Sequence, residues 1–506
     1  MDVQHVLSWV IAFAYFAFLI WVGIAASKKI KSFEGYIVAG RDIGFWMFTI
    51  LVIASCMSGM TILGSSGLGF IGGWPTIWEQ IFVPLSCALT ILLFGTKLHR
   101  VAAKTGYLTL QDYLAHRFES PRLMRGLSGF AVFSVSLIYL VGQYTAVGIT
   151  LQRVLHMDYS LSVIIGAIIV TFYVFLGGLY AVSWTSLVQG LILIVGVLAV
   201  APIIIFKAGG LTHINETMAA IDPNLIKAAF PQTHPPYAGY SFMTPLYIVS
   251  FALLLSLGLA SAPHVINNVL AARKNSYFKW SPLAAFAIYV VVFYLIKIVG
   301  FAARTMVADG VIALPEGVAN PQDFCLIVAV EHVFGPLVWT FFGMMVLAAV
   351  MSTTDRLLLT IGSSFAWDVY RNLFNNKASD ESVTRVSRIV VFVSAAISIV
   401  LALNPPALLA WLIWMGIGVM LSVFVIPILA GLYWKGATRS GAVWSMVVGL
   451  ISSFVFGYLG RFVFKLPFHF SFIPFIIALV VMIVVSLMTK PTSSEVIRDT
   501  ETGFNF

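Results

Sequence analysis

The stretch ASCMSGMTILGSSGLGFIGG, residues 54–73, lies in a long apolar run and combines serines with closely spaced glycines. In lipid, backbone groups freed by a helix break must be satisfied by protein, water or a bound ion. A second apolar run carries Gly258 and Pro263 in SLGLASAPH, residues 256–264. Interrupted helices in corresponding positions of two halves indicate a transporter site, although small residues can also serve close helix packing. We expect two broken membrane helices that face a common site.

The rest of the chain is apolar from end to end. Of its 506 residues, 60% are hydrophobic and 10% are charged, and the mean hydropathy is +0.98. Soluble domains are about 25% charged, and a helix needs about 20 apolar residues to cross a bilayer. The sequence therefore predicts an all-α polytopic membrane protein with about thirteen transmembrane helices. Their expected limits are 5–26, 44–71, 76–98, 126–154, 158–180, 184–207, 241–263, 281–303, 335–367, 386–403, 407–432, 441–461 and 468–488.

The two broken spans are the second and the seventh, so corresponding helices lie five positions apart in the chain. This spacing predicts two five-helix repeats of inverted topology. The expected organisation is a single transmembrane domain over 1–490, with repeats at about 44–207 and 241–432. The peripheral helices would be about 5–26, 441–461 and 468–488. Residues 491–506 would form a polar, mobile cytoplasmic tail.

The net charge is +9, and the positions of the basic residues indicate the membrane topology. Lysines and arginines gather in alternate loops, which is the positive-inside pattern. The opposite loops hold only Arg153, Lys207, Lys227, Arg304, Arg461 and Lys465. This distribution argues against a nucleic-acid partner and predicts a plasma-membrane protein with its N-terminus outside and its C-terminus in the cytoplasm. The first apolar run is followed by Lys28 and Lys29 and not by a cleavage site, so we interpret it as a membrane helix.

Another apolar run contains LAAVMSTTDRLLLT, residues 347–360. An ionisable residue inside a membrane helix marks a pathway or a binding site by default. Asp355 lies three residues after Ser352 and shares its helix face, whereas Arg356 points about 100° away. The alternative is that both charged side chains reach the cytoplasmic interface.

Five motifs spread along the chain resemble the sodium/solute symporter family, whose members include sodium-coupled proline, pantothenate, galactose and sialic acid transporters. The motifs are ASCMSGM (54–60), FLGGLYAVSWTSLVQG (175–190), APH (262–264), AAVMST (348–353) and GLYWKGATRSGA (431–442). NPPALLAWLIW, residues 404–414, together with AGLYW looks most like the pantothenate branch. The resemblance implies a LeuT-like core and alternating access.

The resemblance also implies a sodium site, with sodium as the coupling ion. Carried over by position, the carbonyls of Ala54, Met57 and Ala349 and the hydroxyls of Ser352 and Thr353 would bind it. Hard cations prefer oxygen ligands, and an unwound helix frees carbonyls to supply them. Many members have an aspartate where this chain has Cys56, and another where it has Ser186. Asp355 and Ser186 are therefore candidates for a second site that takes a cation or a proton.

Substrate contacts are expected on spans two to four by the same resemblance. The candidates are Ser58, Ser65, Ser66, Trp78, Glu79, Gln80, Gln143 and Tyr144. Leu255 and Leu259 replace aromatic residues of the proline-transporting branch, so proline is disfavoured. Lys297 is expected to extend outward from its span, toward water.

The predicted function is sodium-coupled symport of a small organic acid, such as pantothenate or a monocarboxylate, into the cell by a monomeric unit. A proton-coupled symporter and a transporter-like sensor are the alternatives. An enzyme is not expected, because the soluble stretches hold no metal cluster, nucleophile elbow or phosphate loop.

Overall fold

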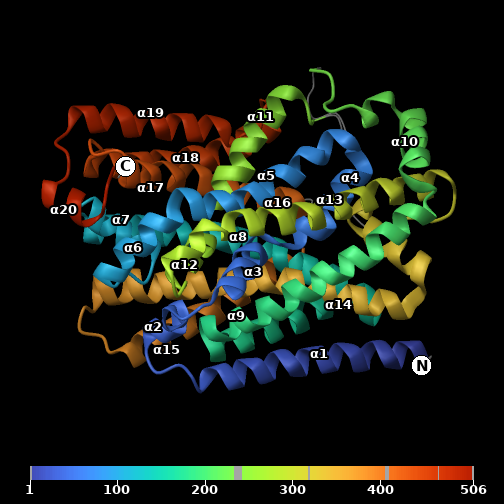
Figure 1. Ribbon diagram of the computed structural model, residues 1–506, viewed down its shortest axis with the longest axis horizontal. Helices are drawn as coiled ribbons and strands as arrows, with labels where there is room; N and C mark the ends of the chain where they lie inside the picture. Colours follow the sequence, from blue (N-terminus) through green and yellow to red (C-terminus); the bar gives the residue numbers. More distant parts are fainter. Residues whose placement is uncertain (1–2, 233–241, 317–319, 405–408, 465, 504–506) are drawn as a thin grey trace.

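The structure is a computed structural model that describes residues 3–232, 242–316, 320–404, 409–464 and 466–503. These residues form a bundle of helices (Figure 1). The helices around the candidate site are α3 (Phe45–Cys56), α4 (Ser65–Gly72), α5 (Glu79–Leu89), α8 (Pro121–Leu155), α9 (Tyr159–Lys207), α11 (Pro245–Leu253), α12 (Pro263–Leu270), α13 (Ser281–Ala308) and α14 (Cys325–Ser363). The others are α1 (Val3–Ser27), α2 (Phe33–Val38), α6 (Thr96–Thr105), α7 (Leu110–Arg117), α10 (Gly210–Ile221), α15 (Asp380–Ala402), α16 (Leu409–Met420), α17 (Ile426–Tyr433), α18 (Arg439–Phe462), α19 (Phe472–Met488) and α20 (Ser494–Asp499).

The helix lengths agree with the predicted membrane spans. Ten described helices are long and apolar enough to cross a bilayer, and the bent pair of α3 and α4 makes an eleventh span. α9 has 49 residues, and at 1.5 Å per residue it would be about 74 Å long, more than twice the hydrocarbon thickness. Its backbone leaves the helical region at Gly178, so α9 holds two helices. With the 17-residue apolar helix α19, these elements account for the predicted spans.

Gly178 makes the turn between the two helices of α9 possible. Its φ of 49° and ψ of −145° are conformations that residues with a side chain rarely adopt. A Cβ atom at this position would lie 2.5 Å from the backbone oxygen of Tyr36 in α2. The predicted spans 158–180 and 184–207 are therefore joined with almost no loop.

Both predicted helix breaks are present. α3 ends at Cys56, Met57 is extended with φ −78° and ψ 113°, and the helix that resumes at Thr61 is bent by 66°. In the seventh span, Ala262 is extended and α12 begins at Pro263, which has no N–H to donate. These breaks leave backbone carbonyls without helical partners in the middle of the bundle.

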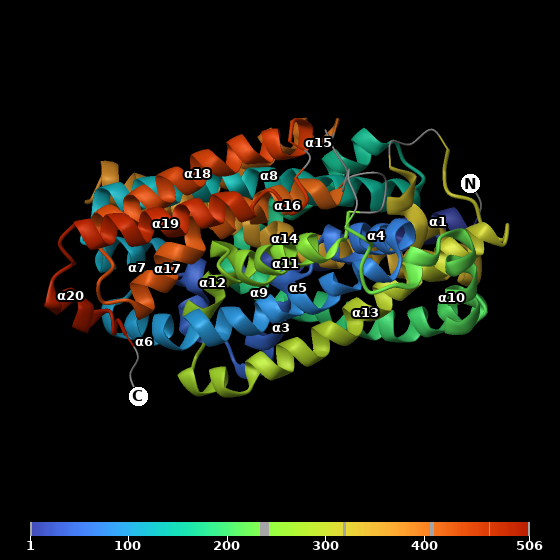
Figure 2. The same cartoon turned by 90° about the horizontal axis from the view of Figure 1, so that it is seen from above.

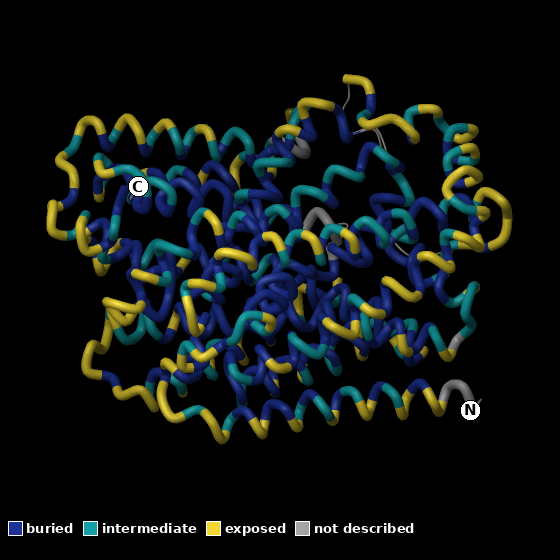
Figure 3. The backbone as a smooth tube through the Cα atoms, viewed as in Figure 1, coloured by how far each residue is buried: buried dark blue, intermediate teal, exposed yellow. Residues whose placement is uncertain are grey.

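The buried residues concentrate along the middle of the bundle, while exposed residues line the outer faces of α1 and α19 (Figure 3). α1 begins at one end of the molecule and α20 lies at the other end (Figures 1 and 2). The long helices therefore cross from one end to the other, and the broken helices lie among them.

The expectation of a mobile tail is wrong for residues 491–503. The backbone N–H of Gly503 donates to Leu432 O at 2.8 Å, and Thr502 Oγ1 donates to Gly431 O at 2.8 Å. Glu501 forms an ion pair with Lys104 at 2.6 Å, and Thr500 is fully buried. The segment is held because its polar groups satisfy carbonyls at the end of α17.

We predict that the N-terminus is external and that α20 is cytoplasmic. On a background without cysteines, a cysteine at position 3 should react with an impermeant maleimide in intact cells, and a cysteine at position 499 should react only after permeabilisation. Position 499 is suitable because Asp499 is exposed, unlike its neighbour Thr500. Labelling of position 499 in intact cells would contradict the predicted orientation.

Candidate functional site

The five oxygens predicted to bind sodium converge where α14 faces the break after α3. Ser352 Oγ lies 3.3 Å from Ala54 O and 2.8 Å from Ala349 O. Thr353 Oγ1 lies 3.2 Å from Ala54 O and also hydrogen-bonds Met57 O. Both side chains are buried. The break aims two carbonyls of the second span at two hydroxyls of the ninth.

This cluster has the chemistry of a site for a monovalent cation. The five groups are neutral oxygens, and none is a carboxylate. A monovalent cation would therefore be held without an opposite full charge, and it could dissociate during the transport cycle. Its assignment as the sodium site stays a prediction, which the geometry makes testable.

Asp355 is buried and its carboxylate faces α9. Asp355 Oδ2 accepts a hydrogen bond from the Tyr173 hydroxyl at 3.0 Å, and Oδ1 has no partner among the described residues. Ser186 is also buried, and its hydroxyl has no partner in the same part of the chain. The alternative that Asp355 reaches the water interface does not fit this burial. The structure pairs Asp355 with Tyr173, and it shows no hydrogen bond between Asp355 and Ser186 in the ranges it describes.

Polar groups of two further helices surround the break. The Gly59 N–H donates to Gln143 Oε1 of α8 at 3.1 Å, and Gln143 Nε2 has no partner among the described residues. The Tyr289 hydroxyl of α13 donates to Cys56 O at 3.0 Å and lies 3.1 Å from Thr61 Oγ1. Free donors beside an unwound backbone could bind a small polar solute.

A buried ion pair lies beside α4, the second half of the broken span. Lys297 Nζ of α13 is 2.8 Å from Glu79 Oε2, and neither side chain is exposed. Ser65 Oγ donates to the same carboxylate oxygen at 3.2 Å, and the Gln80 amide is 2.7 Å from Ser65 Oγ. The expectation that Lys297 extends outward is wrong, because Glu79 provides a partner inside the bundle.

Three other candidates use their polar atoms elsewhere. The Ser66 hydroxyl donates to Ile62 O of its own helix at 2.8 Å, and the Tyr144 hydroxyl lies 3.3 Å from Thr171 Oγ1 of α9. Trp78 Nε1 donates to Ala228 O in the segment after α10 at 2.7 Å. None of these hydrogen bonds joins Ser66, Trp78 or Tyr144 to the polar groups described around the break.

Comparison with known proteins identifies the family. Residues 36–449, most of the chain, match the family model described as "Sodium:solute symporter family". The chain belongs to the sodium:solute symporter family. It is therefore a membrane transporter and not an enzyme.

Curated relatives of this family member cover nearly its whole length. It is 28% identical over 484 residues to the osmoregulated proline transporter OpuE of Bacillus subtilis (strain 168), with 94% of each chain covered. It is 27% identical over 485 residues to the sodium/proline symporter of Escherichia coli (strain K12), covering 94% of this chain and 92% of that protein.

Solved structures place this symporter-family chain in the LeuT-like fold. A sodium-coupled sialic acid symporter in a substrate-bound outward-open state superposes with a TM-score of 0.77 at 20% identity, covering 96% of this chain and 98% of that one. The transporter Mhp1 in a closed conformation superposes with a TM-score of 0.52 at 14% identity, covering 92% and 98%. At these identities the likeness concerns the fold alone. The pantothenate-branch motif includes residues 405–408, which lie outside the described residues, and the branch assignment stays a prediction.

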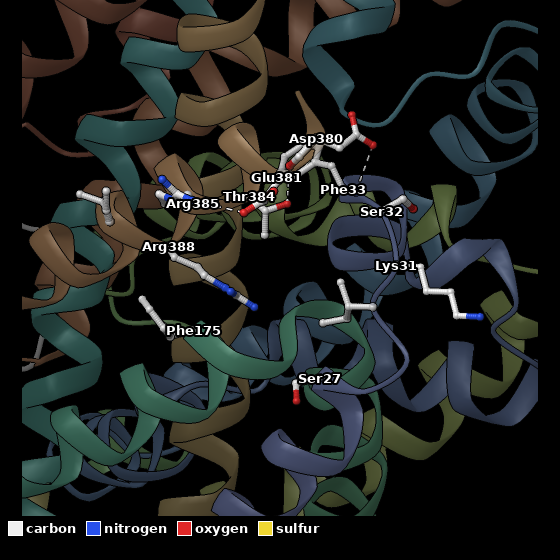
Figure 4. Close-up of a pocket in the computed structure, with 12 residues that line it drawn as sticks. Ser27, Lys31, Ser32, Phe33, Phe175, Asp380, Glu381, Thr384, Arg385 and Arg388 are labelled. Atoms are coloured by element: carbon white, nitrogen blue, oxygen red, sulfur yellow. Dashed lines mark hydrogen bonds and ion pairs between the residues drawn. The ribbon is translucent and has the colours of Figure 1, made fainter. Parts of the chain in front are cut away.

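This family member also has a cavity of about 460 Å³ near the start of α15 (Figure 4). Arg388 extends between Phe175 and the chain after α1. None of the predicted sodium or substrate residues lines the cavity. Its two acids are already paired, Asp380 with Arg371 and Glu381 with Arg385. The cavity is therefore separate from the candidate site.

Sequence reasoning missed several groups around the candidate site. Tyr173, Tyr289 and Asn268 contact the site through side chains on helices distant in sequence. Asn267 and Asn268 are adjacent amides within an otherwise apolar segment, and that pattern was the one available signal for them. No pattern distinguished the two tyrosines from ordinary core aromatics.

Proposed function

We propose that this chain imports a small organic solute across the plasma membrane together with sodium, as a monomeric unit. The observation that supports the proposal is the convergence of Ser352 and Thr353 on the carbonyls of the broken second span. A cation bound there would tie α14 to α3, and its release would free them. Such a link couples ion binding to the relative movement of the two helices. We also propose that the two inverted five-helix repeats extend over about 44–207 and 241–432.

We propose a small organic acid, such as pantothenate or a monocarboxylate, as the solute. Support comes from the branch resemblance and from Leu255 and Leu259, which are buried beside the second break at positions where the proline-transporting branch has aromatic residues. Proline is the second candidate, because both relatives described above are named as proline transporters.

The test is uptake into proteoliposomes that contain the full chain. Labelled pantothenate, monocarboxylates and proline are presented with an inward sodium gradient, with the same gradient of potassium, and with a pH gradient alone. We expect accumulation of one solute only with the sodium gradient. Accumulation driven by pH without sodium would replace the proposal by proton coupling. Sodium binding without accumulation of any compound would favour a sensor.

We predict that Asp355→Asn flattens the sodium dependence of uptake toward a single-site curve. Asp355 has one hydrogen bond and one oxygen without a partner among the described residues, so a second cation could complete its surroundings. The amide keeps the shape of the side chain and removes its charge. Tyr173→Phe is the matched control, because it removes the hydrogen bond and keeps the carboxylate. An unchanged sodium curve in Asp355→Asn, at normal expression, would exclude a cation at this residue.

A further inference from the structure

A small internal cavity lies beyond the candidate sodium site, one to three helical turns farther along α14. Its volume is about 20 Å³. Such a volume holds one water-sized species and needs polar partners to do so. The polar residues that line it are Arg356, His264, Asn267, Asn268, Thr360 and Ser363.

Arg356 presents a free guanidinium edge in this region. Its Nη1 donates to Asn268 Oδ1 at 3.0 Å, while Nε and Nη2 are buried and have no partner among the described residues. Nε and Nη2 form the edge of the guanidinium that binds a carboxylate or another anion through two parallel hydrogen bonds. Asn268 is itself fixed, since its Nδ2 donates to Ser55 Oγ at 2.9 Å. The amide therefore orients the guanidinium and leaves its anion-binding edge free.

The neighbouring carboxylate of Asp355 interacts electrostatically with Arg356, but the two side chains form no close ion pair among the described residues. Asp355 precedes it in the helix, but Asp355 Oδ2 bonds to Tyr173 on α9. No ion pair to Arg356 occurs within the described ranges, although the side chain is only 2% exposed. Asp355 supplies an opposite charge nearby but leaves Nε and Nη2 of Arg356 without hydrogen bonds in the described part of the chain, and buried donors without partners cost free energy.

His264 adds a second donor. It is 1% exposed, and neither ring nitrogen has a partner among the described residues. The ring is held edge-on to Tyr139, with 5.7 Å between centroids and an angle of 84° between the planes. A neutral imidazole keeps one N–H donor.

We propose that Arg356 and His264 form an internal binding site for a small monovalent anion, either chloride or a carboxylate group. The site is distinct from the five oxygens that would hold sodium, and it does not depend on which solute is carried. In the conformation described, the cavity holds one water-sized species, so chloride or formate would enter after a small movement of the lining side chains. A larger carboxylate would reach Arg356 only when the helices around the cavity separate.

The experiment measures the thermal unfolding of the purified full-length protein at constant sodium concentration, with the anion changed. Chloride, formate and gluconate are the three probes, and gluconate is too large for the cavity. We expect chloride or formate to raise the midpoint of unfolding above its value in gluconate. A response to chloride alone identifies a halide site, and a response to formate alone or to both identifies a site that accepts a carboxylate.

The variants locate the effect. Arg356→Gln should abolish the anion-dependent shift or raise the half-saturating concentration by at least about tenfold, which corresponds to about 1.4 kcal/mol. His264→Phe keeps the ring contact with Tyr139 and should weaken the response in the same direction, so it replaces Arg356→Gln if that variant does not fold. Ser398→Ala is the control, because Ser398 is another buried hydroxyl without a partner in the described part of the chain and does not line the cavity. The proposal is overturned if no anion shifts the midpoint, or if the shift persists in the folded Arg356→Gln or His264→Phe protein.

Discussion

Thr353→Ala raises the sodium concentration needed for half-maximal stabilisation by about tenfold or more. Its Oγ1 contacts both Ala54 O and Met57 O, so the substitution removes the oxygen that joins the two carbonyls of the broken helix to α14. Interactions of a polar group with a charge contribute about 1.5–3 kcal/mol, and 1.4 kcal/mol is tenfold in affinity. The measurement is a sodium-dependent thermal shift, which needs no substrate. Ser352→Ala should act in the same direction, since Ser352 Oγ contacts Ala54 O and Ala349 O.

Thr354→Ala is the matched control for this prediction. Thr354 is the next residue, it is equally buried, and its hydroxyl donates to Val350 O of its own helix at 2.8 Å. It should leave the sodium dependence unchanged. If Thr353→Ala and Thr354→Ala give the same curve as the unaltered protein, the sodium site has been placed wrongly.

Lys297→Met destabilises the folded protein by about 3–5 kcal/mol, because it leaves the buried Glu79 carboxylate without its counter-charge. The double variant Glu79→Gln/Lys297→Met should recover most of the loss, since replacing both members of a buried pair is often nearly neutral. The readout is the free energy of unfolding in detergent, with the monodisperse fraction as a check on folding.

Arg385→Gln is the control for the ion pair. Arg385 and Glu381 form an ion pair at 3.2 Å whose side chains are 72% and 84% exposed. Removing an exposed pair should change stability by less than about 1 kcal/mol. A loss in Lys297→Met no larger than in Arg385→Gln would show that the pair between α5 and α13 does not stabilise the fold.

The backbone breaks and the spans could be predicted because their signals are local. A glycine or proline interrupts the helix in which it lies, and the length of an apolar run gives the length of the membrane span. The family resemblance led us to expect Ser352 and Thr353 beside the break in the second span, and their hydroxyls lie there, while their role in binding sodium stays a prediction. The breaks at Met57 and Ala262 confirm the first kind of prediction.

Side-chain partners on distant helices could not be predicted in this manner. Lys297 and Glu79 are 218 residues apart, and nothing in either segment indicates the other. Without a partner, a lone lysine in an apolar run is expected to reach toward water, and that expectation failed. The prediction of a mobile C-terminal tail failed for the same reason. The polar groups of the tail find acceptors at the end of α17, about 70 residues earlier in the chain.

The separation of Glu79 from Lys297 also bears on how the protein is made. A charged side chain at the centre of a membrane helix costs about 2.5–3.5 kcal/mol on insertion, and one nearer the end of the helix costs less. Ribosomes add about 5–20 residues per second, so Glu79 waits about 10–40 s before the residue that pairs with it is synthesised. During this interval the Glu79 carboxylate, near the start of the third span, has not yet met Lys297 and makes insertion of that span less favourable. Substitutions in α13 that remove this partner should therefore act during biogenesis. The third span would leave the membrane more often, and the chain would be degraded before a folded transporter forms.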